Sequence, residues 1–218
     1  MKITFLGHAA FLITTADGTK VVTDPYEPGG FGGAIGYGPL RETADVVVVS
    51  HEHADHNYVS MVPGHPVVVR DAGEETHRGV RFRSLATYHD PSRGAERGPN
   101  TVRVIEADGI TVCHLGDLGD QITAADATCL GPIDVLMVPV GGTFTVDAKG
   151  ATAIVNRLRP RIAIPMHFKT GKTSLNLAPV DGFLAGKQRV RRVDGSDLEA
   201  TRDNLPEPTE IVVLQPAL

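Results

Sequence analysis

Short runs of β-branched and other apolar residues recur along the whole chain, and glycine, proline, aspartate and asparagine separate them. Runs of this length between turn-forming residues are typical of β-strands. The predicted strands cover residues 3–6, 10–14, 20–23, 46–49, 67–69, 80–85, 101–105, 110–113, 135–138, 162–164, 189–193 and 211–214. Asp17-Gly18 and Asp108-Gly109 each stand between two such runs, which predicts two hairpin turns.

Helical patterns are fewer than strand patterns. Residues 124–130 are rich in alanine and follow Thr123, a suitable N-cap. Residues 147–158 begin at Asp147, which can also cap a helix, and end just before Pro160. The apolar positions of this second segment form one helical stripe, made of Ala148, Ala151, Ile154, Val155 and Leu158.

The order of these elements favours a single domain. A third, short helix is predicted over residues 179–184, strands dominate the first half, and helices and strands alternate in the second. No internal repeat and no proline- or serine-rich linker divides the chain. We therefore expect one mixed α/β domain over residues 1–218, with helices covering its sheet.

Residues 25–39, with the sequence PYEPGGFGGAIGYGP, interrupt the pattern of strands. A long segment without regular structure in a compact domain is usually a functional loop or a disordered one. Its aromatic residues favour a loop that closes over a site, with a plain surface loop as the alternative.

Composition narrows the classes of protein. The chain has 218 residues, of which 41% are hydrophobic, and a formal net charge of -5 without any basic run. This charge gives no support to nucleic-acid or membrane-surface binding, and the apolar runs are far shorter than the roughly 20 residues that span a bilayer. The N-terminus lacks the features of a signal peptide, so we expect a cytoplasmic protein. We also expect its partner to be a small-molecule substrate. The sequence leaves a homo-oligomer open. Cys113 and Cys129 are expected to be reduced thiols in the core.

The candidate chemistry is concentrated in SHEHADHN, residues 50–57, which directly follow a run of four valines. A strand that is apolar without alternation is buried on both faces, and ligand sites of α/β sheets lie beyond the carboxyl ends of such strands. His51 and His53 can converge on one ion, while Asp55 and His56 can serve a second ion. Imidazole and carboxylate groups are ligands for Zn²⁺ and similar ions. We therefore predict a metal site at this strand end.

A centre with two metals needs ligands from later in the chain. His89, Asp117 and His167 each come just after an apolar, strand-like run. This shared placement indicates that all three lie near the early cluster.

These residues resemble the signature of the metallo-β-lactamase superfamily, in which H-x-H-x-D-H is followed by a histidine, an aspartate and a histidine. Other local motifs are similar to a small group of metal-dependent hydrolases related to L-ascorbate-6-phosphate lactonase. They are LGHAAF at 6–11, TDP at 23–25, HLGD at 114–117, PVGGTFT at 139–145 and PMHFKT at 165–170.

The resemblance implies an α/β (α+β) fold, a four-layer αβ/βα sandwich of two mixed β-sheets flanked by helices. It also implies two divalent metal ions. His51, His53 and His89 would hold the first ion, Asp55, His56 and His167 the second, and Asp117 would bridge them. Zn²⁺ is the first expectation, and Mn²⁺, Fe²⁺ and Ni²⁺ suit the same donor set.

The chemistry implied by the resemblance is hydrolysis. Two such ions can share a water and lower its pKa towards about 7, and the resulting hydroxide would attack a lactone, ester or phosphoester. Asp55 would be catalytic, since it would ligate a metal and accept a hydrogen bond from the hydroxide. The alternative is a non-hydrolytic sensor or redox protein on the same scaffold.

Further residues are candidates for supporting the metal ligands or for binding substrate. Asp24 follows a strand and can accept the second N–H of a liganding histidine. His8 and His114 lie near the family site positions, and His114 is an alternative to His89 as a ligand. Four cations favour an anionic substrate, namely Arg93 and Arg97 beside His89, and Lys169 and Lys172 after His167.

Overall fold

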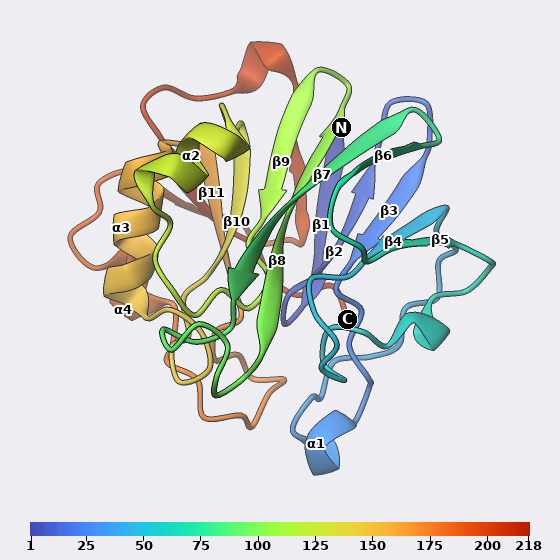
Figure 1. The fold of residues 1–218 in the computed structure, drawn as a ribbon, viewed down its shortest axis with the longest axis horizontal. Helices are drawn as coiled ribbons and strands as arrows, with labels where there is room; N and C mark the ends of the chain where they lie inside the picture. Colours follow the sequence, from blue (N-terminus) through green and yellow to red (C-terminus); the bar gives the residue numbers. More distant parts are fainter.

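Two mixed β-sheets face each other in the computed structural model, which describes residues 1–218 apart from the side chain of Met61 (Figure 1). The six-stranded sheet has the order β13 (Asp197–Glu199), β1 (Lys2–Gly7), β2 (Ala10–Thr14), β3 (Lys20–Thr23), β4 (Val46–Val48) and β5 (Val67–Val69). The eight-stranded sheet has the order β12 (Val190–Arg192), β14 (Glu210–Val213), β11 (Ile162–Met166), β10 (Val135–Pro139), β9 (Ile110–His114), β8 (Pro99–Ala107), β7 (Val80–Tyr88) and β6 (Glu74–His77). The parallel pairs are β3–β4, β4–β5, β9–β10, β10–β11, β11–β14 and β12–β14, and the remaining pairs are antiparallel.

The main core lies between the two sheets. Alternate residues of β1, such as Ile3 and Phe5, point into it from one side, and Val112 and Val135 point into it from the other. All four are at most 1% exposed. This alternation follows from the pleat, which turns successive side chains to opposite faces.

The outer faces of the two sheets are covered differently. Three helices cover the eight-stranded sheet, α2 (Ala124–Leu130), α3 (Ala148–Leu158) and α4 (Asp181–Leu184), and they bury a second apolar cluster. Over the six-stranded sheet lie mainly loop residues, including Tyr26, Ile35 and Tyr37, and the short 3₁₀ turn η1 (Val59–Met61), whereas α1 (Gly30–Gly33) projects beyond the end of the sandwich. The expected sandwich of two mixed sheets is confirmed, and segment 25–44 takes most of the place of a helical layer on this side.

The predicted elements are found with small shifts at their ends. The N-cap at Thr123 forms a capping box with Asp126, and the side chain of Asp147 caps α3. Both predicted hairpins join antiparallel strands. The sequence missed β6, β13, the one-turn helix α1 within the expected loop 25–39, and the 3₁₀ turns η1 and η2 (Arg202–Asn204). Both missed strands are short edge strands rich in charged residues, so they carry no apolar pattern.

Two further expectations have outcomes in the fold. Cys113 is buried and free, but Cys129 is exposed near the end of α2, so the prediction of two core thiols is wrong for Cys129. Within the part of the chain that the structure describes, no helix has the length and apolar character needed to cross a membrane.

A buried guanidinium joins the two sheets. Arg103 of β8 is 1% exposed, and its Nε donates to the Val49 carbonyl at 3.0 Å. Its Nη atoms donate to the carbonyls of Asp71 and Arg70 and to the hydroxyl of Ser84. Since Val49 directly precedes the SHEHADHN segment, Arg103 fixes the position from which that segment starts.

Replacing this guanidinium should destabilise the fold. In Arg103→Met, the buried carbonyls lose charged donors, and we expect the free energy of unfolding to fall by about 3 kcal/mol in urea titrations. Arg78→Met is the matched control, because the Arg78 side chain is 70% exposed, and surface changes cost only about 0.5 kcal/mol. Equal stability of the two variants would contradict this role of Arg103.

Candidate metal centre

Each predicted ligand lies at or just beyond the carboxyl end of a strand. The segment 51–56 follows β4, and His89, Asp117 and His167 follow β7, β9 and β11. His8 follows β1 in the same way, and Asp24 follows β3. Strands from both sheets therefore deliver these side chains to one rim of the sandwich, where two groups of candidate ligands form.

The first group consists of His51, His53 and His89. Their candidate ligand atoms all lie within 4.8 Å of one another. The His51 ring centroid is 4.7 Å from that of His53 and 4.9 Å from that of His89. His53 is exposed and the other two are buried, so this group opens to solvent through His53.

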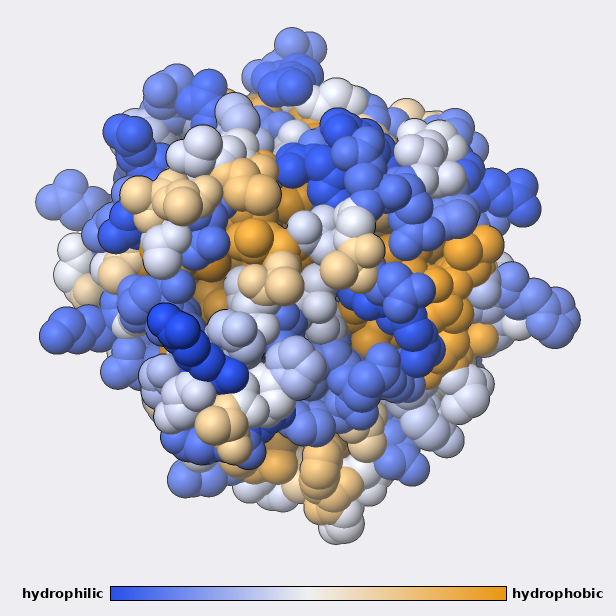
Figure 2. Space-filling model, viewed as in Figure 1, coloured by the Kyte–Doolittle hydropathy of each residue, from blue (hydrophilic) through white to orange (hydrophobic). Residues whose placement is uncertain are grey.

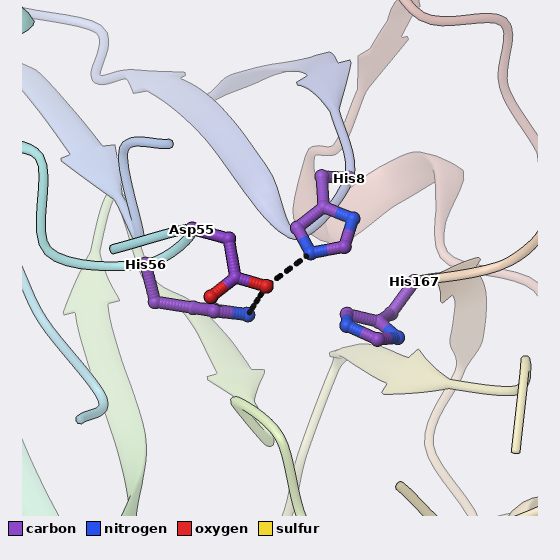
Figure 3. Close-up of side chains that lie close together, drawn as sticks. All are labelled: His8, Asp55, His56 and His167. Carbon is purple, nitrogen blue, oxygen red and sulfur yellow. Dashed lines mark hydrogen bonds and ion pairs between the residues drawn. The ribbon is translucent and has the colours of Figure 1, made fainter. Parts of the chain in front are cut away.

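The second group consists of Asp55, His56 and His167, with His8 beside them (Figure 3). The ligand atoms of these four residues also lie within 4.8 Å of one another. His56 Nε2 is 3.6 Å from Asp55 Oδ2, and His8 Nε2 is 3.1 Å from the same oxygen. The close-up shows side chains from three separate parts of the chain pointing into one space.

Asp117 connects the two groups. One of its oxygens, Oδ2, is 3.2 Å from His89 Nε2 in the first group and 3.4 Å from His167 Nε2 in the second. The other oxygen, Oδ1, is 3.2 Å from His56 Nε2. A carboxylate in this position has the geometry of a ligand shared between two ions.

The protonation states of several residues in the cluster suit the binding of cations. Burial tends to raise the pKa of Asp117, but the neighbouring His167 and His56 hold it well below its usual range. Burial lowers the pKa of His51 and of His167 to about 3, with a further contribution from nearby histidines. At neutral pH, the carboxylate is therefore ionised and these two imidazoles are neutral, which are the protonation states that bind metals.

His56 behaves differently from these two histidines. Burial alone would lower its pKa, but the carboxylates of Asp117, Asp55 and Asp24 raise it well above its usual value. In the metal-free protein, a proton on His56 therefore offsets part of the negative charge that an ion would otherwise neutralise.

Unpartnered polar atoms test whether the site fits metal ions. Among the described side chains, buried atoms without a hydrogen-bond partner include Nε2 of His51, His56 and His167 and Oδ1 of Asp117. Leaving such atoms buried and unpaired is costly, and native structures rarely do so. All four atoms belong to predicted ligands, so the donor set fits divalent ions of the kind that histidine and aspartate bind.

Asp24 positions two of the predicted ligand rings, that of His56 directly and that of His51 through Ser50. Its Oδ2 accepts from His56 Nδ1 at 2.9 Å and from the Ser50 hydroxyl at 2.6 Å, and its Oδ1 accepts from the Ser50 N–H at 2.7 Å. Ser50 Oγ in turn lies 2.9 Å from His51 Nδ1. These contacts engage Nδ1 of both rings and leave Nε2 of both without a hydrogen-bond partner.

His8 and His114 have different surroundings, although both are 1% exposed. Because the Asp55 carboxylate is ionised, His8 Nε2–H can donate to it and orient it. His114 Nε2 contacts the Ala9 carbonyl at 2.8 Å, and its Nδ1 accepts from the Gly116 N–H at 3.0 Å. Both nitrogens of His114 are thus engaged by the backbone, which argues against a ligand or substrate role for this ring.

Sequence reasoning missed two side chains that shape the site. Asn100 Oδ1 accepts from the Asp117 N–H at 3.0 Å, and its Nδ2 donates to the Leu115 carbonyl. Gly116 lies between Leu115 and Asp117 in the chain. Its φ is 57°, and a Cβ at this position would collide with Asn100 and Ser50. Asp90 is buried directly after His89 and accepts four backbone N–H groups of the following loop. Only its position next to His89 could have pointed to Asp90.

The cationic side chains that were predicted to bind substrate differ in their distance from the pocket beside the predicted metal ligands. Arg93 is exposed, and Lys169 Nζ donates to the Leu175 carbonyl at 3.2 Å. Neither is among the residues that line the pocket of about 380 Å³ beside the metal ligands. Arg97 does line this pocket, together with His53, Asp55, His89 and Asp117.

Two mixed sheets packed face to face, with a histidine–aspartate cluster at their shared rim, define the class as a metallo-β-lactamase-type sandwich. A family model described as "Beta-lactamase superfamily domain" matches residues 2–167. The chain belongs to this superfamily.

Individual relatives agree with this assignment. A UPF0173 metal-dependent hydrolase of Thermococcus kodakarensis is 32% identical over 197 residues, covering 78% of this chain and 85% of that protein. A crystal structure from Thermotoga maritima, whose description proposes a Zn-dependent hydrolase of the metallo-beta-lactamase superfamily, is 39% identical. It has a TM-score of 0.79 and covers 98% of this chain and 97% of its own.

A more distant structure shares only the fold. CmlA, a diiron beta-hydroxylase from Streptomyces venezuelae, is 17% identical with a TM-score of 0.56, covering 76% of this chain and 44% of its own.

The two groups of ligands predict how metal content responds to mutation. We expect about two ions per chain in the reconstituted protein, and about one after either His53→Ala or His167→Ala, because each removes a ligand from one group. Asp117→Ala should weaken both sites. Elemental analysis measures these contents, with the exposed His65→Ala as control. Two ions retained in both single-group variants would contradict the division.

Asp24 should affect metal affinity without touching the ions. Asp24→Asn removes the anionic acceptor behind His56, and we expect affinity to fall by about 10- to 100-fold in chelator competition. The exposed Asp203→Asn serves as the matched control. An unchanged affinity would mean that the orientation of His56 does not depend on this carboxylate.

Proposed function

We propose that this protein is a binuclear metal-dependent hydrolase that acts on a lactone, ester or phosphoester of a small anionic substrate. Two ions would be bound, Zn²⁺ as the first expectation, and Asp55 would be the catalytic carboxylate. The relatives from Thermococcus kodakarensis and Thermotoga maritima are described as metal-dependent and Zn-dependent hydrolases, which supports metal-dependent hydrolysis.

The position of Asp117 is the observation that carries the proposal. Its carboxylate lies within 3.4 Å of imidazole nitrogens from both ligand groups, and it is 2% exposed. A buried acidic side chain between two sets of histidines is difficult to explain as a device for stability, since it leaves its Oδ1 without a hydrogen-bond partner. It is readily explained as a ligand shared by two cations.

The side chains around the ions would divide the remaining work. When bound, the ions supply Lewis acidity and lower the pKa of water towards about 7. Asp55 faces the pocket and is held by His8, so it can orient the attacking nucleophile and accept its proton. Asp24 and Ser50 fix His56 and His51, which keeps the ligand geometry constant during turnover.

Replacement of Asp55 tests this function. In Asp55→Asn, we expect kcat to fall by about 10²- to 10⁴-fold, since acid–base side chains contribute roughly that much. The activity is measured on panels of lactones, carboxyl esters and bis(p-nitrophenyl) phosphate, with metal content determined in parallel. Asp194→Asn, an exposed aspartate, is the matched control.

The results separate the competing functions. Full turnover by Asp55→Asn at unchanged metal content would refute the catalytic role. An iron-loaded protein with visible absorbance and oxygen sensitivity, inactive on every panel, would favour the redox alternative and defeat the hydrolase proposal.

A further inference from the structure

The pocket beside the metal ligands has one cationic and one apolar part. Besides metal ligands, Arg97, Phe31, Phe144 and Leu175 line its volume of about 380 Å³. Pockets of this size accept small organic ligands, and a few polar groups on apolar walls usually fix their orientation. The residues that line the pocket therefore indicate the chemical character of a substrate that would fit it.

We propose that Arg97 binds an oxyanion of the substrate that is not part of the bond that is cleaved, and that Phe31, Phe144 and Leu175 enclose an apolar portion of the same substrate. The substrate class is thus an ester or lactone with an aliphatic or aromatic body and a terminal carboxylate or phosphate. This inference rests on the proposed hydrolytic function and specifies the substrate of the same site.

Arg97 has a fixed backbone and an available guanidinium. Its N–H donates to the Asp90 carboxylate at 2.7 Å, and the same carboxylate accepts from Ser92, Gly94 and Glu96. Asp90 directly follows His89, so this loop is tied to a predicted metal ligand. The guanidinium contacts the neighbouring, exposed Glu96 at 3.4 Å, a weak surface pair that an incoming anion can replace.

Its location also favours Arg97 over the other cations. It borders two further hollows that adjoin the pocket, one shared with His89 and Phe144 and the other shared with His51 and His53. Arginine binds carboxylate and phosphate through two parallel hydrogen bonds. Lys172 Nζ, by contrast, already donates to the Leu218 carbonyl at 2.6 Å.

Phe31 supplies an exposed part of the apolar wall. It is 57% exposed, although large apolar side chains are usually buried, and its φ of 52° is unusual for an aromatic residue. Its neighbours Gly29, Gly32 and Gly33 also have positive φ, and a Cβ on any of them would meet nothing within 4 Å. The tip of this loop is therefore exposed to solvent, and backbone hydrogen bonds such as that from the Gly29 N–H to the Ile35 carbonyl at 2.8 Å close it.

The base of the same loop is fixed to the opposite wall. Gly36 N–H donates to the Lys172 carbonyl at 2.7 Å, and Ser174 N–H donates to the Ala34 carbonyl at 3.0 Å. Leu175 follows directly, so the two apolar walls are joined below the tip. Figure 1 shows α1, which contains Phe31, projecting from the body of the fold, and Figure 2 shows apolar surface at this lower edge. A substrate that contacts Phe31 would cover an aromatic face that is otherwise in water.

Binding of paired acids to the metal-loaded protein tests the inference without requiring turnover. We compare α,ω-dicarboxylates of four to eight carbons with monocarboxylates of equal length by calorimetry, so that the shared carboxylate cancels any direct contact with the ions. We expect at least one dicarboxylate to bind about tenfold more tightly than its partner, because a charged pair to arginine forms only with the second carboxylate. In Arg97→Gln this preference should vanish, whereas Arg93→Gln, in the same loop, should keep it.

A separate pair of variants tests whether the apolar wall contributes to binding. Phe31→Ala should weaken binding of the longer acids more than that of the shorter ones, and Val67→Ala, an exposed apolar residue of β5, should weaken neither. A preference that survives in Arg97→Gln, that is absent in the wild type, or that is lost in Arg93→Gln would overturn the inference.

Activity on 4-nitrophenyl esters with and without a terminal carboxylate then separates the two proposals. Loss of the anion preference in Arg97→Gln with normal turnover of neutral esters supports the inference. Binding behaviour as expected, with no hydrolysis of any ester, would defeat the proposed function and leave Arg97 as an anion site.

Discussion

The central interaction of the site is the one between the Asp117 carboxylate and three histidines that follow different strands. It places a negative charge at the rim where the two sheets meet, beside His167, whose pKa is lowered, and beside His56 and His89, whose pKa values are raised. Such an arrangement costs stability when no cation is present, because buried charges and unpaired polar atoms lose hydration. The surrounding fold must therefore be rigid enough to keep these side chains together.

That rigidity comes from strands and from a layer of buried polar contacts behind the ligands. Val46–Val48 is packed on both faces, and Arg103 fixes the residue that follows it to the other sheet. Asp24, Ser50 and Asn100 each hold a ligand or the backbone of a ligand. Each ligand group thus draws residues from both sheets, and Asp24 and Ser50 connect His56 of one group to His51 of the other.

The pocket combines this fixed floor with walls that differ in exposure to solvent. His53, Asp55, His89 and Asp117 belong to the floor, and Arg97 stands on a loop that the Asp90 carboxylate organises. Phe31 stands on a glycine-rich tip that has few neighbours. A fixed set of metal-binding side chains beside an exposed aromatic side chain would hold the reacting bond in place while leaving the rest of a substrate accessible to solvent.

The elements with strong periodicity could be predicted from the sequence alone, and so could the histidines and aspartates that the structure brings together at one rim. Strand ends and caps are local patterns, and histidines and aspartates that follow apolar strands have few other uses, so the rim could be predicted from single segments. The polar edge strands β6 and β13 could not be predicted, because their pairing depends on partners far along the chain. The same holds for Arg103 and Asp90, which look like surface residues in the sequence and are buried only by packing. Only the tertiary structure decided that Arg97, rather than Arg93 or Lys169, borders the pocket, because the direction of a loop side chain is set by contacts that no local pattern encodes.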